Sequence, residues 1–308
     1  MELGPRCSLV SADVGEPLPG TAPVAAAWLL VEQPGPWGRE APTQSHLPGE
    51  VAHPLAAAAA AAGVRLGLVR RPGRHPDRGA PRSVFLAFTR PGASALRLLR
   101  MRDPRELLDL DLTRLATQGP GSVGEPSPPV LAVCTNARRD RCCAIGGRPL
   151  AAHAAAAFGG ADAGRVWETS HLGGHRFSPT AVVLPQGSVH GRLTDPQAVD
   201  LLVAADAGRL AAHGYRGRSA FSKPAQVGEA LVRAKLGIEG VDDLDAASVW
   251  DAGGDGGPGW LVEVTHRDGR RWTVAVHEVE SAQARPESCG KPAVALRSLL
   301  PSRLQQVT

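Results

Sequence analysis

Short apolar runs in the middle of the chain alternate with longer amphipathic stretches. Runs of β-branched and other apolar residues that end at turn-forming residues predict strands, and longer stretches rich in alanine and leucine predict helices. The resulting order, β-α-β-β-β-α, is typical of a thioredoxin-like layout in which helices cover a short mixed sheet. The predicted strands are 130–136, 164–170, 180–185 and 188–193, and the predicted helices are 148–158 and 195–214.

The first part of the chain shows a similar order of elements. Strands are predicted at 26–32, 65–70, 83–89 and 95–100, and helices at 53–63 and 103–116. The similar order suggests a duplicated fold, although no side-chain motif repeats between the two parts. The expected fold class is therefore α/β.

Two stretches rich in glycine and proline, 117–129 and 251–259, are typical of linkers. The first contains GPGSVG, which has the letters of a dinucleotide-binding motif, but no helix is predicted to follow it, as that motif requires. After the middle part, an amphipathic helix at 224–237 and a hairpin at 260–279 predict a smaller α+β region.

We therefore expect three parts. They are an N-terminal α/β domain at 1–117 that is a candidate for a thioredoxin-like fold, a thioredoxin-like domain at 127–213, and a C-terminal helix and hairpin region at 214–308.

The 308 residues are 43% hydrophobic, so the chain can bury a sizeable core. The apolar runs fall short of the roughly 18 residues that span a bilayer, and the N-terminus lacks a basic region followed by an apolar one. We expect a soluble, cytoplasmic protein that does not enter a membrane. The net charge is +4, but the basic residues are scattered and nearly all are arginine, so nucleic-acid binding is not expected.

Five cysteines, Cys7, Cys134, Cys142, Cys143 and Cys289, form no even disulfide framework. In a reducing compartment, clustered cysteines indicate metal or redox chemistry.

His171 and His175 stand four residues apart in the sequence HLGGH. A helical pair is disfavoured, because each of the two intervening glycines costs about 1 kcal/mol in a helix relative to alanine. The histidines are therefore predicted on a loop between the strands 164–170 and 180–185.

Cys134 ends one predicted strand and the HLGGH loop follows the next, so both loops can emerge at the same end of the sheet. Two thiolates and two imidazoles suit a tetrahedral Zn²⁺ ion and equally a [2Fe-2S] cluster with histidines on one iron. Zinc sites favour shorter cysteine spacings, and the longer cysteine loop here favours a bulkier cofactor. The spacing leaves both alternatives open.

The stretches CTNARRDRCCA (134–144), SHLGGHRFSPTAVVLPQGSVHGRL (170–193) and RPESCGKP (285–292) resemble the sucrase/ferredoxin-like family, as does the segment 7–38. Members of this family include thioredoxin-like ferredoxins with two cysteine and two histidine ligands. The resemblance thus implies a [2Fe-2S] ferredoxin domain at 127–213.

The resemblance implies that Cys134, Cys143, His171 and His175 hold the cluster. In the family the second thiolate follows an Arg-Asp pair and lies nine residues after the first, which selects Cys143. Cys142 stands where relatives can carry a basic residue, so an exchange of ligand between the neighbouring thiols stays open.

A cluster with these ligands implies ferredoxin-like electron transfer, more in keeping with a non-enzymatic carrier than with an enzyme. Two Fe³⁺ and two sulfides sum formally to +2, so four thiolates give −2 whereas two thiolates and two neutral imidazoles give 0, which favours the addition of an electron. An imidazole whose outer nitrogen reaches water can also take up a proton, so we expect proton-coupled transfer. The alternative is a zinc-stabilised Cys2His2 binding or scaffold protein without redox activity.

No flavin or nicotinamide motif is present, so an electron donor or acceptor protein of unknown identity is expected as partner. Hydrolysis of sucrose, which the family's label suggests, is not expected, because no two carboxylates can be placed at catalytic separation. Arg138, Arg139 and Arg141 flank the cysteine loop, where they favour the reduced cluster or dock an acidic donor, unless they simply form a solvated turn. His190 is a candidate neighbour of the site, and the first interpretation of Cys289 is a buried structural thiol.

Overall fold

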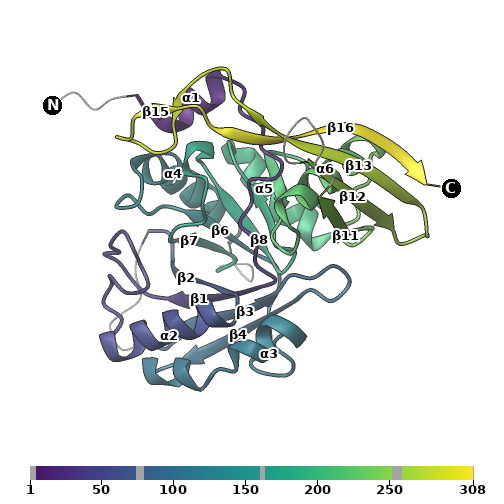
Figure 1. Cartoon of the computed structure of the whole chain (residues 1–308). Helices are drawn as coiled ribbons and strands as arrows, with labels where there is room; N and C mark the ends of the chain where they lie inside the picture. The colour runs from purple at the N-terminus through teal and green to yellow at the C-terminus, as the bar shows by residue number, and fades with distance from the viewer. Residues whose placement is uncertain (1–4, 74–79, 160–163, 252–258, 308) are drawn as a thin grey trace.

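The computed structural model describes residues 5–73, 80–159, 164–251 and 259–307. Its centre is a ten-stranded mixed sheet with the order β10-β9-β8-β6-β7-β2-β1-β3-β4-β5 (Figure 1). The strands are β1 (Ala27–Glu32), β2 (Val64–Arg70), β3 (Arg82–Phe88), β4 (Ala95–Met101), β5 (Glu125–Pro126), β6 (Val130–Cys134), β7 (Val166–Thr169), β8 (Ala181–Leu184), β9 (Ser188–His190) and β10 (Tyr215–Arg218). The α/β fold class expected from the sequence is confirmed.

Two sets of four strands within this sheet repeat one pairing scheme. In the first set, β1 pairs parallel with β2 and antiparallel with β3, which pairs antiparallel with β4. In the second set, β6 pairs in the same ways with β7 and β8, and β8 pairs with β9. A helix connects each parallel pair, α2 (Gly49–Ala61) in the first set and α4 (Arg141–Ala157) in the second. The similar order of elements in the two parts of the sequence thus corresponds to a repeated topology.

The two sets meet at a short antiparallel pairing of β2 with β7. Arg70 and Glu168, which face each other in this pairing, form an ion pair of 2.6 Å. The Glu168 carboxylate also accepts a hydrogen bond of 2.8 Å from Thr135, the residue that follows β6. One sheet therefore runs through the first two predicted domains, and their separation stays a prediction.

Alternate residues of the strands face different hydrophobic cores, as the twofold period of a strand requires. One core lies between the first set and the helices α2 and α3 (Leu112–Gln118), and another lies between the second set and the helices α4 and α5 (Asp195–Asp206). The third, central core takes inward-facing residues of both sets, among them Trp28, Phe85 and Trp167. In Figure 1 the strands β2 and β7 of the large sheet lie above α2 and α3 and below α4.

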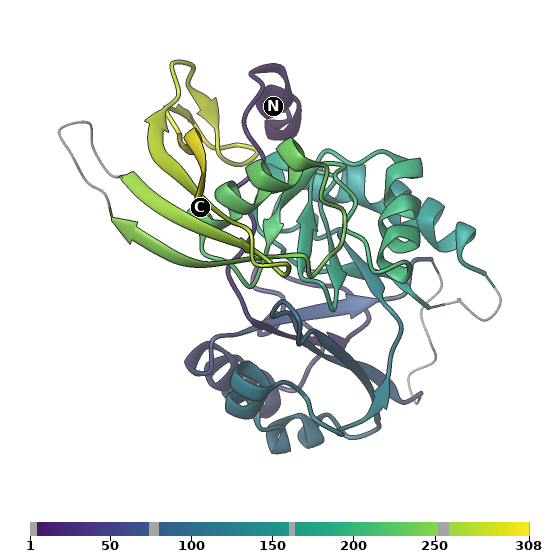
Figure 2. The ribbon, with the colours of Figure 1, turned by 90° about the vertical axis from the view of Figure 1, so that its right-hand side faces the viewer.

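After β10 the chain forms α6 (Lys223–Leu236) and an antiparallel sheet with the order β11-β12-β13-β16. The strands of this sheet are β11 (Leu244–Asp251), β12 (Gly259–His266), β13 (Arg271–Glu280) and β16 (Arg297–Val307). Helix α6 contacts these four strands and also β10, so it joins the two sheets (Figure 2). The predicted hairpin is confirmed, because β12 and β13 pair antiparallel.

Neither glycine-rich stretch is a free linker over its described residues. The stretch 117–129 contains β5, which pairs with β4. In the stretch 251–259, Asp251 ends β11 and Gly259 begins β12, and these two strands are paired neighbours. Residues 252–258 of that prediction lie outside the described residues. The linker prediction at 251–259 is therefore corrected to a connection within one sheet.

Aspartate caps explain where two helices depart from their predicted bounds. Helix α4 begins seven residues before its predicted start, because the Asp140 side chain accepts a hydrogen bond of 2.8 Å from the Cys142 backbone N–H. The predicted helix 103–116 is split into the 3-10 helix η1 (Pro104–Asp109) and α3, since Asp103 caps the first and Asp111 the second. No helix in the described part of the chain is long and apolar enough to cross a membrane.

A buried carboxylate, Glu16, links the N-terminal segment to two distant parts of the chain. It lies after the helix α1 (Cys7–Asp13) and forms ion pairs of 2.8 Å with Arg176 and with Arg285. Arg176 belongs to the 3-10 turn η3 (His175–Phe177), and Arg285 begins the short strand β14 (Arg285–Pro286), which pairs with β15 (Ala293–Val294). Burial raises the pKa of Glu16, but the two arginines outweigh it and hold the pKa below its usual value.

We expect Glu16→Gln to lower the free energy of unfolding by about 3–5 kcal/mol near neutral pH, because Arg285 is then left buried without its partner. The lowered pKa means that the carboxylate stabilises the fold above the unfolded value of about 4.3 and that this stabilisation is lost as the pH falls below it. Denaturant unfolding of both proteins at about pH 7 and about pH 3 should therefore show a difference that shrinks in acid. The matched control is Glu50→Gln, whose exposed ion pair with Arg105 predicts a loss within about 1 kcal/mol. A Glu16→Gln loss no larger than that of the control would contradict this account.

Candidate metal centre

The parallel pairing of β6 with β7 brings the two predicted ligand loops together. Cys134, the last residue of β6, stands opposite Thr169, the last residue of β7. Because parallel strands end at the same edge of a sheet, the chain leaves both strands at one place. From there one loop leads to the first turn of α4, which contains Cys143, and the other carries His171 and His175. The predicted meeting of the two loops is present in the structure.

Cys134 and Cys143 form a buried thiol pair in the central core. The Cys143 thiol hydrogen-bonds to the Cys134 sulfur, which lowers the pKa of Cys134 and raises the pKa of Cys143. A hydrogen bond from the ring of His171 lowers the pKa of Cys134 further. Both hydrogen bonds favour the thiolate form of Cys134, which is the form of cysteine that binds metals.

The two histidines lie on a loop, as expected, and each is partly buried. Their ring centroids are 5.5 Å apart. Three ring nitrogens, His171 Nδ1 and both nitrogens of His175, are buried without a hydrogen-bond partner. Burial also lowers the pKa of His175, which favours its neutral form. A neutral imidazole with a buried, unpartnered nitrogen is well suited to bind a metal.

The two glycines between the histidines have the conformations for which glycine is needed. Gly173 has φ of +86° and Gly174 has φ of +68°, both in the region that other residues rarely adopt. A Cβ at position 174 would collide with the guanidinium of Arg216 and lie 2.9 Å from the Phe177 ring. A Cβ at position 173 would meet only Arg65, at 3.9 Å. The close packing around this loop is therefore concentrated at Gly174.

Two arginines that the sequence did not single out donate hydrogen bonds to the backbone of this loop. Arg65 donates to the His171 carbonyl at 3.1 Å, and the fully buried Arg216 donates to the Gly173 carbonyl at 3.1 Å. Each arginine lies on a strand of the sheet, and arginine is rare in buried strands. Their position within strands is the one signal by which the sequence could have indicated these two arginines. Of the arginines proposed to flank the site, Arg139 pairs with Glu40.

Cys142 faces away from the thiol pair and contacts two other cysteines. Its sulfur lies 3.7 Å from that of Cys7 and 3.2 Å from that of Cys289. Among the described residues, one group of metal-ligating side chains has all its ligand atoms within 4.8 Å of one another, and it consists of Cys7, Asp140, Cys142 and Cys289. The structure thus contains a group of cysteine and aspartate side chains that could bind a metal, and this group differs from the predicted ligand set. Cys289, interpreted from the sequence as a buried structural thiol, is partly buried and has two thiols beside it.

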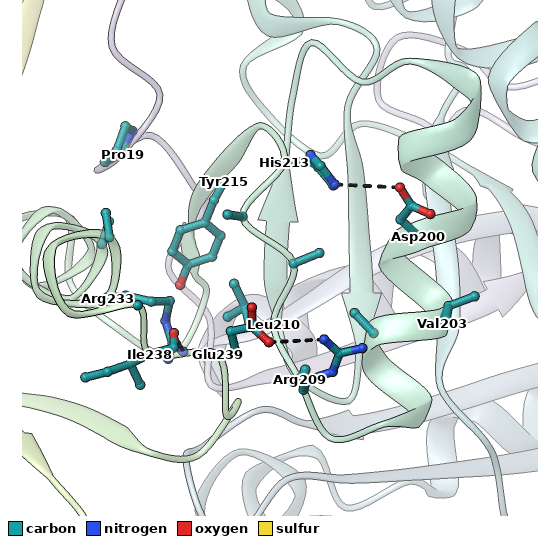
Figure 3. A pocket seen from close by; sticks show the side chains of 16 residues that line it. Pro19, Asp200, Val203, Arg209, Leu210, His213, Tyr215, Arg233, Ile238 and Glu239 are labelled. Atoms are coloured by element: carbon teal, nitrogen blue, oxygen red, sulfur yellow. Dashed lines mark hydrogen bonds and ion pairs between the residues drawn. The ribbon is translucent and has the colours of Figure 1, made fainter.

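His190 and the pocket in Figure 3 are both separate from the predicted ligands. Both ring nitrogens of His190 are occupied, one by the His213 carbonyl at 2.7 Å and one by the Ser188 hydroxyl at 3.1 Å. The pocket has a volume of about 660 Å³ and lies between α5 and α6 (Figure 3). None of the four predicted ligands lines it.

A comparison with protein families identifies the family of the chain. The family model for sucrase/ferredoxin-like proteins matches residues 18–217, or 200 of the 308 residues. The chain belongs to this family. No curated protein and no solved structure matches it. The matched segment includes the predicted ligands Cys134, Cys143, His171 and His175 but ends before Cys289.

We expect Gly174→Ala to lower the free energy of unfolding more than Gly173→Ala does. Both substitutions force alanine into the left-handed region, which costs about 1–2 kcal/mol. Gly174→Ala must also displace Arg216 and Phe177, which adds about 1–3 kcal/mol. Chemical denaturation of the two variants measures the difference, and equal losses would show that the packing against Arg216 is not a constraint on the loop.

Proposed function

We propose that this member of the sucrase/ferredoxin-like family transfers electrons through a [2Fe-2S] cluster held by Cys134, Cys143, His171 and His175. The observation that carries the proposal is the meeting of a buried thiol pair with two imidazoles that keep three unpartnered nitrogens. When bound, such a cluster supplies one-electron redox chemistry at a higher potential than a cluster with four cysteines.

The grouping of the four side chains supports a two-metal centre over a single zinc ion. A tetrahedral zinc ion needs all its ligand atoms within about 4 Å of one another. Among the described residues, these four do not form a group whose ligand atoms all lie within 4.8 Å. Instead, the two thiols lie against each other and the two imidazole rings lie 5.5 Å apart, while the His171 ring also hydrogen-bonds to Cys134. Two pairs of ligands suit two irons, one with cysteines and one with histidines.

The pairs also differ in depth, which favours proton uptake on the histidine side. Cys134 and Cys143 are each 1% exposed, whereas the His175 side chain is 14% exposed. His175 Nε2 lies 3.8 Å from the carboxylate of Asp140. Burial raises the pKa of Asp140, but hydrogen bonds from the Cys289 and Cys142 backbone outweigh it and bring the pKa to about 2. This fixed negative charge stabilises a proton at His175 Nε2.

Two arginines near the proposed cluster favour the addition of an electron. Arg65 and Arg216 bind the carbonyls of the histidine loop, so their positive charges lie close to the four proposed ligands. A nearby positive charge in a poorly solvated site favours the addition of an electron. We propose that the donor or acceptor is a second protein, and Arg138, which is exposed on the cysteine loop, suits an acidic partner. All five cysteines are free, which suits the cytoplasm or another reducing compartment.

Metal and sulfide analysis of the full chain, purified without oxygen, tests the proposal. We expect about two irons and two sulfides per chain, a red-brown colour and an EPR signal after reduction. Cys134→Ser and His171→Ala should remove iron and sulfide together, because each removes a ligand. The matched control is His190→Ala, which removes a buried histidine of the same sheet and should keep both. A colourless chain whose zinc is lost in Cys134→Ser and in His171→Ala would replace this proposal by the zinc-stabilised scaffold.

We expect the midpoint potential to rise as the pH falls, by up to about 59 mV per pH unit for one proton per electron. Adding an electron raises the pKa of a histidine ligand, so the reduced form takes up a proton and acid favours reduction. Voltammetry between about pH 6 and pH 9 measures the slope. A potential that does not change over this range would exclude proton coupling while leaving electron transfer in place.

A further inference from the structure

Three cysteines outside the proposed cluster meet at one point beside it. The sulfur atoms of Cys7, Cys142 and Cys289 form a triangle with sides of 3.7, 3.2 and 3.6 Å. These cysteines are separated in the sequence by 135 to 282 residues, so local chain geometry does not bring them together. Cys7 and Cys142 are buried and Cys289 is partly buried.

Asp140 occupies a fourth corner over this triangle. Its two carboxylate oxygens lie 3.8 and 3.6 Å from the Cys7 sulfur. Three donors fix the carboxylate, namely the backbone N–H groups of Cys142 and Cys289 at 2.8 Å each and the Ser288 hydroxyl at 2.9 Å. A carboxylate has about four lone-pair positions, and the fourth faces the Cys7 thiol, whose proton would leave when that thiol binds a metal.

We propose that Cys7, Cys142, Cys289 and Asp140 form a structural site for one Zn²⁺ ion. With Zn–S bonds of about 2.3 Å and Zn–O bonds of about 2.0 Å, a regular tetrahedron has S···S edges of about 3.8 Å and S···O edges of about 3.5 Å. The distances from Cys7 to the Asp140 oxygens, 3.6 and 3.8 Å, and two sides of the triangle, 3.6 and 3.7 Å, lie within about 0.3 Å of these edges. The third side, 3.2 Å between Cys142 and Cys289, would have to lengthen by about 0.6 Å.

The ligand set identifies the class of ion. Three thiolates favour a soft or borderline ion and exclude the oxygen-seeking Mg²⁺ and Ca²⁺. Four protein ligands in a closed tetrahedron leave no position for a substrate, which is the arrangement of structural zinc sites. Hydrogen-bond donors already lie beside two of the sulfurs, since Ser8 donates to Cys142, and the Cys7 backbone and the Arg141 side chain donate to Cys289. Such donors stabilise a metal-bound thiolate, and the thiol protons would leave when the ion binds.

The zinc ion would join three segments around the proposed cluster. Cys7 lies on α1, Cys142 in the first turn of α4, and Cys289 between β14 and β15. Cys142 precedes Cys143, and Asp140 faces His175, so the zinc would fix the turn that presents one proposed cluster ligand and the carboxylate near another. None of the four residues of the proposed cluster belongs to this zinc site, so the two proposals can fail independently.

Zinc analysis of the full chain, incubated with zinc sulfate under reducing conditions and passed over a weak chelator, tests the site. We expect about one zinc per chain, lost in Cys289→Ser and in Cys7→Ser and kept in Cys134→Ser and His171→Ala. Cys289 should also react with a maleimide about tenfold more slowly in the zinc-loaded wild type than after removal of zinc by a strong chelator. This reactivity is measured on the wild-type chain, so the test does not depend on how the variants fold.

Three outcomes would overturn the site. A wild-type chain that takes up no zinc excludes it. Zinc that is kept in Cys289→Ser but lost in Cys134→Ser belongs to the proposed cluster ligands. An intact mass about 2 Da lower, with two fewer titratable thiols, would identify a disulfide between Cys142 and Cys289, whose sulfurs lie close together. A chain without iron or sulfide that still shows the expected zinc pattern would refute electron transfer and leave the zinc site standing.

Discussion

The carboxylate of Asp140 is the group on which the arrangement of both candidate metal sites depends. A buried negative charge is stable only when donors surround it, and here they come from Cys142, Ser288 and Cys289. The first of these bonds starts α4 and so directs Cys142 and Cys143 in different directions. The other two hold the C-terminal segment against the cysteine loop. One desolvated charge therefore sets where a helix begins and which thiols meet.

The two sets of strands in the large sheet explain why the cysteines of the proposed cluster site are buried whereas its histidines are partly exposed. The inward faces of the two strand sets form the central core, and Cys134 and Cys143 lie within it. The loop that carries the histidines leaves the edge of the sheet, and Arg65 and Arg216 donate hydrogen bonds to its backbone carbonyls. The thiol pair is thus shielded by hydrophobic packing, whereas the two histidine residues are partly exposed.

The sequence predicts what depends on local pattern and misses what depends on distant contacts. Apolar periodicity located the strands, and the glycines of HLGGH correctly indicated a loop, because both signals act within a few residues. The strands of the two sets are joined by two residue pairs between β2 and β7, which no local pattern in the sequence indicates. The meeting of Cys7 with Cys289 spans 282 residues. The roles of Arg65 and Arg216 were not predicted, because the position of an arginine within a strand does not indicate which carbonyl it binds.

The ion pair between Glu16 and Arg285 has a consequence for the order in which the molecule is assembled. Every strand of the ten-stranded sheet precedes residue 219, whereas Arg285 lies 67 residues beyond Arg218, the last residue of that sheet. Since a chain folds from its N-terminus as it is made, the sheet and both ligand loops can form before Arg285 reaches Glu16. The ion pair is thus a late contact, which joins the C-terminal segment to a sheet whose strands have already been made.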